Sequence, residues 1–182
     1  MKTGAPPILH TERLLLRGHR LHDFPASFSM WSDPLVTAYI GGKPSTEQQA
    51  WSRFLQYVGH WSLMGFGYWA IEEKSTHTFI GEAGFANFHR EIDPTMKDAP
   101  EIGWALASSA HGKGFATEAL RSIISWGDEH FASPRTVCLI DVENLPSIGL
   151  ARKIGFTEFQ QSMVNGRPTI FFERSARKNP PR

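Results

Sequence analysis

Apolar positions follow two periodicities along the chain, and these predict an order of strands and helices. Leu14–Arg17 is an expected first strand, and Tyr68–Glu72 and Thr78–Phe85 are expected strands joined by a polar turn. Between the first strand and Tyr68, apolar residues recur every three to four positions, which is typical of a helix with one buried face. These residues are Trp51, Phe54, Leu55, Val58 and Trp61.

Capping signals place the start of this helix. Ser45 and Gln48 have the spacing of a capping box, in which each side chain satisfies a backbone N–H of the other residue. Upstream, Asp33-Pro34 interrupts a further helical region, because a proline inside a helix removes a backbone hydrogen bond and clashes with the preceding turn. We therefore expect a broken helix before the long one.

The second half of the chain predicts a strand, a long helix, a buried strand, a short helix and a closing hairpin. The expected bounds are Glu101–Ala107, Gly114–Phe131, Val137–Val142 and Pro146–Ile154, and Asn165-Gly166 is a strong signal for a two-residue hairpin turn. The third of these segments is apolar apart from Asp141, as expected of a central strand that is buried on both faces.

Strands outnumber helices, meander early and cross over late, which predicts a mixed α/β (α+β) sheet flanked by helices instead of a doubly wound Rossmann domain. The length of 182 residues suits one domain. We expect it to span residues 8–174, with flexible termini at 1–7 and 175–182.

Composition narrows the functional classes. Apolar residues make up 41% and charged residues 20%, which excludes a disordered chain, and the net charge of +1 argues against a nucleic-acid binder. Phe54–Ile71 carries no formal charge but holds polar residues and glycines, so we expect no membrane span. The lone Cys138 and the absence of a signal peptide favour a cytoplasmic location.

The glycine-rich segment 111–117, between a strand and a helix, is the strongest candidate for ligand binding. Its glycines allow close backbone approach, the helix start favours an anion, and Lys113 adds a positive charge. A plain turn that needs positive φ is the alternative. Thr117 stands where a Rossmann fingerprint needs its third glycine, and the P-loop spacing is also missing.

Asn144 and Ser147 form a second constellation, at the exit of the expected central strand. Either side chain could simply cap the following helix by accepting from its first N–H groups.

Together these segments resemble the GNAT superfamily of acyl-CoA-dependent N-acetyltransferases. His111-x-x-Gly114-x-Ala116 matches the superfamily's phosphate loop except at its first position. The superfamily's downstream pattern, Asn-x-x-Ser followed by Lys-x-Gly-Phe, is matched by Asn144, Ser147, Lys153, Gly155 and Phe156. Three further stretches look like the RimJ/RimL-like branch, which acetylates ribosomal-protein N-termini: residues 11–17, 80–85 and 101–104.

The resemblance implies a mostly antiparallel, twisted sheet whose two central strands splay apart to admit coenzyme A. Backbone N–H groups of 112–117 would bind the pyrophosphate, and Leu106 and Ala107 would extend along the pantetheine arm. A backbone N–H near Trp104–Leu106 would polarise the thioester carbonyl. The implied cofactor-binding residues are Leu106, Ala107, His111, Gly112, Lys113, Gly114, Ala116, Thr117, Asn144 and Ser147.

Two departures from the family pattern affect the chemistry. His111 replaces the usual Gln or Arg of the phosphate loop, and Ala151 stands where many members carry a tyrosine acid. The nearby hydroxyl is Ser147, which would hydrogen-bond the leaving thiolate. A thiol of pKa about 8.5 leaves without a strong acid, so the second departure is tolerable.

Glu101 is the candidate base, because it opens the strand expected to line the acceptor side; a surface glutamate at a strand end is the alternative. Glu82 and Asp141 are weaker candidates that could instead pair with a neighbouring arginine. Cys138 is expected to be an inert core thiol. Scattered histidines and a single cysteine predict no metal site.

The sequence therefore predicts an enzyme that transfers acetyl from acetyl-CoA directly to a primary amine, either a peptide N-terminus or a small molecule. A degenerate CoA-binding regulatory module without transferase activity is the alternative, and a nucleotide-binding oxidoreductase is disfavoured by the missing glycine. We expect no nucleic-acid or membrane partner, and a monomer or a homodimer.

Overall fold

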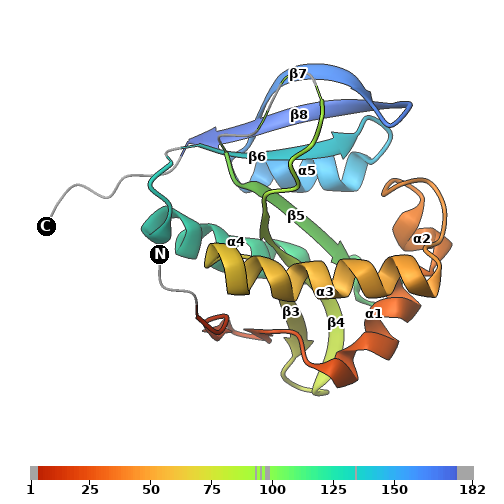
Figure 1. Ribbon diagram of the computed structural model, residues 1–182, viewed down its shortest axis with the longest axis vertical. Coiled ribbons are helices and arrows are strands. Elements are labelled where there is room, and N and C mark those ends of the chain that lie inside the picture. The colour runs from red at the N-terminus through yellow and green to blue at the C-terminus, as the bar shows by residue number, and fades with distance from the viewer. Residues whose placement is uncertain (1–3, 93, 95, 97–98, 134, 176–182) are drawn as a thin grey trace, which may run out of the picture.

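A computed structural model describes residues 4–92, 94, 96, 99–133 and 135–175. Within them, eight strands form one sheet in the order β1-β2-β3-β4-β5-β6-β8-β7 (Figure 1). The strands are β1 (Leu9–His10), β2 (Leu14–Arg17), β3 (Tyr68–Glu73), β4 (Thr78–Ala86), β5 (Glu101–Leu106), β6 (Arg135–Asp141), β7 (Thr157–Val164) and β8 (Arg167–Ser175).

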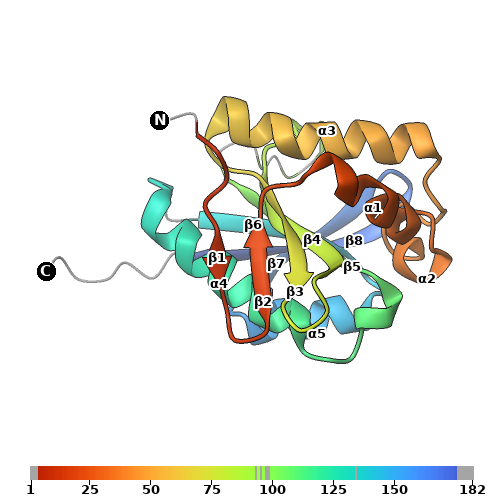
Figure 2. The same cartoon turned by 90° about the horizontal axis from the view of Figure 1, so that it is seen from below.

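Helices cover both faces of the sheet. Figure 2 shows α1 and α3 on one face and α4 and α5 on the other. The helices are η1 (Leu21–Asp23), α1 (Phe24–Trp31), α2 (Pro34–Thr37), α3 (Glu47–Met64), η2 (Ser108–Ala110), α4 (Phe115–His130) and α5 (Leu145–Lys153). The expected mixed α/β architecture is confirmed, and Asp33 caps α2 at the expected break by accepting from the Leu35 amide.

The sheet opens between β5 and β6. These two strands are parallel and align at one residue pair, Glu101 with Val137, whereas every other neighbouring pair is antiparallel. Beyond that pair the strands separate toward Leu106 and Asp141. The splayed central strands implied by the family resemblance are therefore present.

The buried face of α3 differs from the sequence expectation. Phe54, Tyr57 and Trp61 are buried, but Leu55 is 50% and Val58 45% exposed. Trp51 is also 36% exposed, and its ring contacts Phe24 and Phe54, with ring centroids 4.8 and 6.0 Å apart. The apolar stripe of α3 is wider than the surface that the sheet offers, so one edge of the stripe faces outward.

The start of α3 also corrects the sequence analysis by one residue. The capping box is formed by Thr46 and Gln49, because Thr46 Oγ1 accepts from the Gln49 amide at 3.3 Å and Gln49 Oε1 accepts from the Thr46 amide at 2.9 Å. The expected cap, Ser45, instead accepts from the Arg53 guanidinium at 3.2 Å. Two overlapping capping patterns in the sequence explain the error.

Other bounds shift by one or two residues, and the turn chemistry agrees with expectation. Gly155 has φ +95° just after α5, and the hairpin turn has φ +50° at Asn165 and +78° at Gly166. Most of the expected flexible termini, residues 1–3 and 176–182, lies outside the described residues, while Ser175 closes β8. Among the helices that are described, none combines the length and apolarity needed to cross a membrane.

A buried ion cluster fixes β2 against its neighbours. Arg17 binds Asp23 through two hydrogen bonds of 2.7 and 2.8 Å and Glu72 through one of 2.9 Å. The side chains of Arg17 and Asp23 are 5% and 2% exposed. Burial alone would raise the pKa of Asp23, but hydrogen bonds from Arg17 and the Arg20 amide outweigh burial and lower it. The cluster therefore joins β2, η1 and β3 most strongly when Asp23 is ionised.

The contribution of Asp23 to the free energy of unfolding should depend on pH. Because its pKa is lowered by folding, Asp23 stabilises fully above its unfolded pKa of about 3.9 and loses that contribution as pH falls through the lower folded value. Asp23→Asn should reduce the free energy of unfolding by about 3–5 kcal/mol at pH 7, measured by urea titration, since it leaves Arg17 buried without its main partner. The difference from the unmodified chain should shrink below pH of about 4.

Glu173→Gln is the matched control, because the Arg135–Glu173 pair is solvent-exposed, with side chains 37% and 40% exposed. Its cost should stay at or below about 1 kcal/mol. Equal losses in the two variants would contradict the assignment of Arg17–Asp23 as the buried anchor.

Candidate active site

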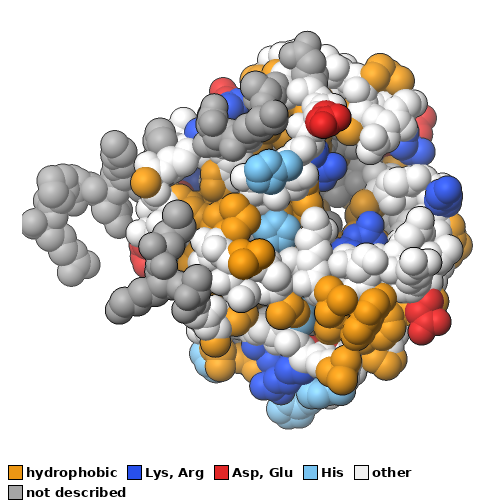
Figure 3. Space-filling view, viewed as in Figure 1, with side chains coloured by type: hydrophobic (Ala, Val, Ile, Leu, Met, Phe, Trp, Pro, Cys, Tyr) orange, Lys and Arg blue, Asp and Glu red, His pale blue; other side chains and the backbone are white. Residues whose placement is uncertain are grey.

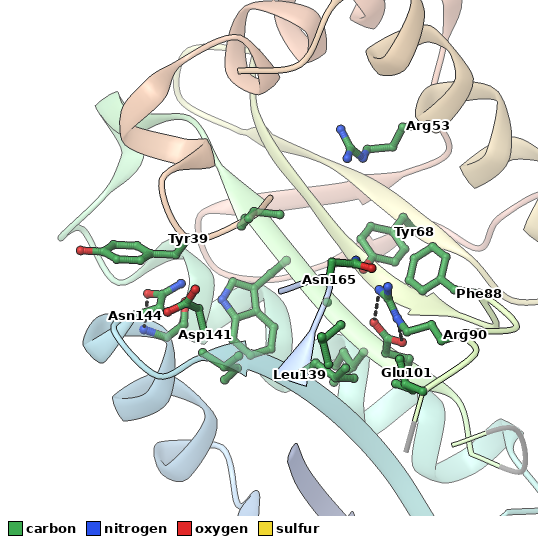
Figure 4. A pocket seen from close by; sticks show the side chains of 18 of the residues that line it. Tyr39, Arg53, Tyr68, Phe88, Arg90, Glu101, Leu139, Asp141, Asn144 and Asn165 are labelled. Carbon is green, nitrogen blue, oxygen red and sulfur yellow. Dashed lines mark hydrogen bonds and ion pairs between the residues drawn. The ribbon is translucent and has the colours of Figure 1, made fainter. Parts of the chain in front are cut away.

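A cavity of about 720 Å³ lies where β5 and β6 separate. Figure 3 shows the hollow on the face that α3 covers, with basic side chains beside it, and Figure 4 shows the residues around it. Its lining comes from both halves of the chain: Trp31, Tyr39, Ile40, Arg53, Gln56, Tyr57, Tyr68, Phe88, Arg90, Glu91, Ile92, Glu101, Ile102, Gly103, Trp104, Leu139, Ile140, Asp141, Asn144, Ser147, Val164 and Asn165.

The glycine-rich loop lies outside this lining, at the N-terminus of α4. Gly112 and Gly114 have φ of +75° and +80°, so both positions use the left-handed conformation that glycine adopts without strain. The backbone N–H groups of 112–117 donate to no acceptor in the part of the chain that the structure describes. Lys113 is exposed beside them. The loop thus presents a row of free donors at a positive helix end, which suits a phosphate group.

Arg13, in the turn between β1 and β2, clamps this loop. It donates to the Lys113 carbonyl at 2.9 Å and to Glu118 at 2.7 Å, and its guanidinium lies 4.6 Å from the centre of the Phe115 ring. Glu118 also accepts from the Arg13 amide at 2.8 Å and from Thr11 at 2.6 Å. These contacts hold the loop from outside and leave its N–H groups open.

Alternate residues of β5 turn their backbone groups to opposite sides. Ala107 donates to Ile80 at 2.9 Å on the β4 side, whereas Pro100 accepts from the Val137 amide on the β6 side. By this alternation, the backbone groups of Trp104 and Leu106 face the opening between β5 and β6. The Ala107 amide is already bonded to β4, so the backbone groups available along the expected path of the pantetheine arm are those of Trp104 and Leu106.

His111 contacts the strand that precedes it. Its Nε2 lies 2.9 Å from the Leu106 carbonyl oxygen, so the imidazole reaches the backbone group that was expected to meet the pantetheine arm. The N–H of His111 donates to Ser108 and does not join the free row. His111 therefore shapes the end of β5, and its backbone is not part of the anion site.

The two capping candidates have different roles. Asn144 Oδ1 accepts from the Ser147 amide at 3.2 Å, which makes Asn144 the N-cap of α5. The hydroxyl of Ser147 makes no hydrogen bond with the described residues and lines the cavity. Ser147 is thus free to meet a ligand at the edge of the opening.

Glu101 lies in the cavity wall at the point where β5 and β6 still pair. Arg90 donates to both of its oxygens, at 2.7 and 2.8 Å, and the pair is drawn as dashed lines in Figure 4. Burial alone would lower the pKa of Arg90, but the hydrogen bonds and charge of Glu101 outweigh it and raise the pKa. Glu101 is therefore held by one ion pair on one side and faces the cavity on the other.

Two weaker base candidates are committed to other contacts. Glu82 is fully buried and accepts from Trp31 Nε1 at 2.6 Å and from Ser27 at 3.3 Å, so its expected arginine partner is absent from the described contacts. Asp141 does pair with an arginine, Arg167, at 2.6 Å. Burial raises the pKa of Cys138 far above its usual range, which keeps this thiol protonated in the core.

Sequence reasoning missed several residues that line the cavity. Arg53 comes from the helix α3 and lies 3.8 Å over the Trp31 ring, and Tyr57 and Tyr68 stack on each other with ring centroids 4.3 Å apart. Arg90 was missed because it follows β4 in an irregular loop. These residues form no sequence motif. An arginine or a tyrosine in a helix, strand or loop does not by itself indicate a binding site.

The family follows from comparison with known proteins. Residues 13–157 match the acetyltransferase (GNAT) domain. The chain belongs to the GNAT acetyltransferase family. It is 34% identical over 149 residues to an uncharacterized N-acetyltransferase, p20, of Bacillus licheniformis, across 81% of each chain. It is also 30% identical over 154 residues to another uncharacterized N-acetyltransferase, YoaA of Bacillus subtilis, across 82% of each chain.

Solved acetyltransferases share the fold. A GNAT-family acetyltransferase from Bordetella pertussis superposes with a TM-score of 0.82 at 30% identity, covering 93% of this chain and 100% of that one. An acetyltransferase from Salmonella typhimurium, described as modifying the N-terminal serine of ribosomal protein L7/L12, gives 0.74 at 17% identity, covering 93% and 99%. The resemblance to the RimJ/RimL-like branch is confirmed at the level of the fold.

GNAT enzymes transfer acetyl from acetyl-CoA, and the residues present fit this cosubstrate. The row of free N–H groups at 112–117 suits a pyrophosphate, and the opening between β5 and β6 leads from that row to the cavity. The described residues contain no group of three or more His, Cys, Asp or Glu side chains that could hold a metal ion.

A side chain at Gly114 should remove CoA binding without unfolding this acetyltransferase. In Gly114→Val a β-branched residue would have to adopt φ +80°, the conformation that orients the donors of the loop, while its Cβ would meet only Arg13 Nη2, at 3.5 Å. We expect no measurable CoA binding by calorimetry, and a stability loss of about 1–2 kcal/mol from the left-handed backbone.

Gly166→Val is the matched control, because Gly166 has φ +78° and its Cβ would meet nothing within 4 Å. This variant should carry a similar backbone strain and retain CoA affinity. Undiminished CoA affinity in folded Gly114→Val would remove the loop from the binding site.

Substitutions at Ser147 and Asn144 should have different effects, the first on turnover and the second on stability. Ser147→Ala should lower kcat by about 10- to 1,000-fold, since it removes a hydrogen bond to developing charge, with the CoA Kd nearly unchanged. Asn144→Ala should lower the free energy of unfolding by about 1 kcal/mol through loss of the cap. If Ser147→Ala instead lost stability and kept normal turnover per folded molecule, Ser147 would be a capping residue.

Proposed function

We propose that this acetyltransferase transfers acetyl from acetyl-CoA directly to a primary amine within a ternary complex, without a covalent enzyme intermediate. The acceptor is an amine of low pKa, such as an N-terminal α-amine or a small-molecule amine. The observation that carries the proposal is the meeting, at one opening in the sheet, of unpaired β5 backbone groups, the free Ser147 hydroxyl and a cavity walled by Glu101.

The backbone of β5 supplies the electrostatic part of the reaction. An N–H of Trp104 or Leu106 donates to the thioester carbonyl oxygen, on which negative charge develops during attack. The amine nitrogen forms a bond to the carbonyl carbon as the carbon–sulfur bond breaks. Ser147 donates to the departing thiolate, which needs little further help because thiols ionise near pKa 8.5.

Glu101 takes the proton that the amine loses, directly or through one water. Arg90 uses one lone pair on each carboxylate oxygen. A carboxylate offers about four lone-pair sites, so sites on the cavity side remain for an amine N–H. The ion pair therefore holds Glu101 in a fixed orientation while leaving it able to bind the acceptor.

The cost of neutralising the acceptor favours an α-amine. At pH 7 the free-energy cost of removing the proton is about 4.6 kcal/mol for a lysine-like amine of pKa 10.4. For an α-amine of pKa 7.7–8.0 it is only about 1 kcal/mol. A site with one carboxylate base, and with Ala151 where many family members carry a tyrosine acid, is better matched to the smaller cost. The fold shared with enzymes named for N-terminal acetylation agrees with this preference.

The decisive test is release of free thiol from acetyl-CoA with a panel of amines. Peptides with a free α-amine and no lysine should react, and the same peptides with a blocked α-amine and one lysine should react more slowly. A value of kcat/KM that rises with pH toward the pKa of the amine is expected. CoA binding without thiol release for every amine would favour the alternative, a CoA-binding regulatory module.

Glu101→Gln in the same assay should lower the rate most below pH 8 and be partly rescued at higher pH, where free amine is plentiful. The expected loss at pH 7 is about 10²- to 10⁴-fold, as for removal of a general base. Glu129→Gln, an exposed position on α4, is the control and should leave the rate unchanged. Unmodified rates for Glu101→Gln at pH 7 would exclude Glu101 as the base.

A further inference from the structure

Two guanidinium groups line the cavity, and their charges are balanced differently. Arg90 is neutralised by the two hydrogen bonds that it donates to Glu101. Arg53 has no carboxylate within 4.0 Å among the residues that the structure describes. The wall formed by α3 therefore adds a positive charge without an ion-pair partner, and Glu91, in the loop after β4, adds a negative one elsewhere in the lining.

Arg53 is held in place by contacts that leave most of its donors free. Its guanidinium lies 3.8 Å over the Trp31 ring, and one nitrogen donates to Ser45 at 3.2 Å. Trp31 is itself fixed, because its indole N–H donates to the fully buried Glu82 at 2.6 Å. A flat guanidinium on a fixed ring is prepared to bind a carboxylate or phosphate with two parallel hydrogen bonds.

Two buried phenols also line the cavity, each near a carboxylate. Burial raises the pKa of Tyr57 well above the usual value, and the charge of Glu82 adds to the rise. Burial likewise raises the pKa of Tyr68, where the charge of Glu101 adds to the rise and the charges of Arg90 and Arg53 oppose it only in part. Both tyrosines therefore stay protonated at physiological pH and add no negative charge that would compete with a ligand anion for Arg53.

We infer that the acceptor amine carries an anionic group, a carboxylate or a phosphate, which Arg53 binds while the amine reaches Glu101. The inference rests on the proposed function, because it names the class of amine that the same cavity accepts. Figure 4 shows the two ends of the site: Arg53 extends from α3, and Glu101 comes from β5 on the other side of the labelled aromatic residues. One end thus attracts a negative group and the other an amine.

Matched pairs of amines test the inference. The probes are glutamate α-amide against glutamine α-amide, β-alanine against its amide, and O-phosphoethanolamine against ethanolamine. The first two pairs differ by one negative charge and the third by nearly two at pH 7, and the pairs separate carboxylate from phosphate. Two readouts are taken for each probe: kcat/KM from thiol release with acetyl-CoA, and Kd from calorimetry in the presence of CoA, where no transfer occurs.

For at least one pair, the anionic member should have a kcat/KM about 10- to 100-fold higher and a Kd lower by a similar factor, as expected for charge-assisted hydrogen bonds. Arg53→Gln should abolish this advantage, leave the neutral member unchanged and leave the Kd of CoA unchanged. Arg53→Lys should restore part of it. Arg121→Gln, an exposed position on α4, is the control and should retain the full advantage.

Other outcomes separate the two ideas. Equal use of the anionic and neutral members by the unmodified enzyme would overturn the inference about Arg53 while leaving acetyl transfer intact. An equal loss for both members in folded Arg53→Gln would also overturn it. Arg53-dependent binding of an anionic amine without thiol release would support the inference and overturn the proposed transferase activity.

Discussion

Two parallel strands that align at one residue pair set the conditions for the rest of the molecule. Past Glu101 and Val137, β5 and β6 no longer satisfy each other's backbone groups, which a closed sheet would not tolerate. Each strand is instead secured on its outer edge, β5 by β4 and β6 by β8, in continuous antiparallel ladders. The opening persists because its two walls belong to separately braced halves of the sheet.

Two carboxylates at this opening are each paired with an arginine. Glu101 with Arg90 stands at the closed end, where the strands still touch, and Asp141 with Arg167 stands where β6 ends. Both carboxylates are buried and both have a partner, as buried charges require. Arg53 on α3 and Glu91 after β4 also line the cavity, and neither has an ion-pair partner among the described residues. The electrostatic character of the cavity therefore changes from the wall with Arg53 to the wall with Glu91.

Much of the fold could be predicted from the sequence, because local signals carried it. The hairpin at Asn165-Gly166, the break at Asp33-Pro34 and the glycine that ends α5 each need one backbone conformation, and the residue type reveals it. The face of α3 could not be predicted, because Trp51 and Leu55 are as apolar as Phe54. Only the limited width of the underlying sheet decides which of them is buried.

The site divides in the same way. Segment 111–117 and Ser147 follow from motif spacing, and the structure adds that Asn144, not Ser147, is the cap. The partner of Glu101 could not be predicted, since Arg90 and Glu101 meet through an irregular loop that carries no periodic signal. The backbone direction of Ala107 was equally hidden, because a shift of one residue in register reverses the side to which an amide points.

The clamp between Arg13 and Glu118 has a consequence for how the protein forms during synthesis. Its backbone hydrogen bond joins residues 105 positions apart in the chain, so the phosphate loop cannot reach its held form until α4 has been made and has docked on the first hairpin. Contacts between distant segments form late, because the intervening chain must first be ordered. Competence to bind the cosubstrate therefore arises near the end of folding, and a bound cosubstrate stabilises only chains that have completed it.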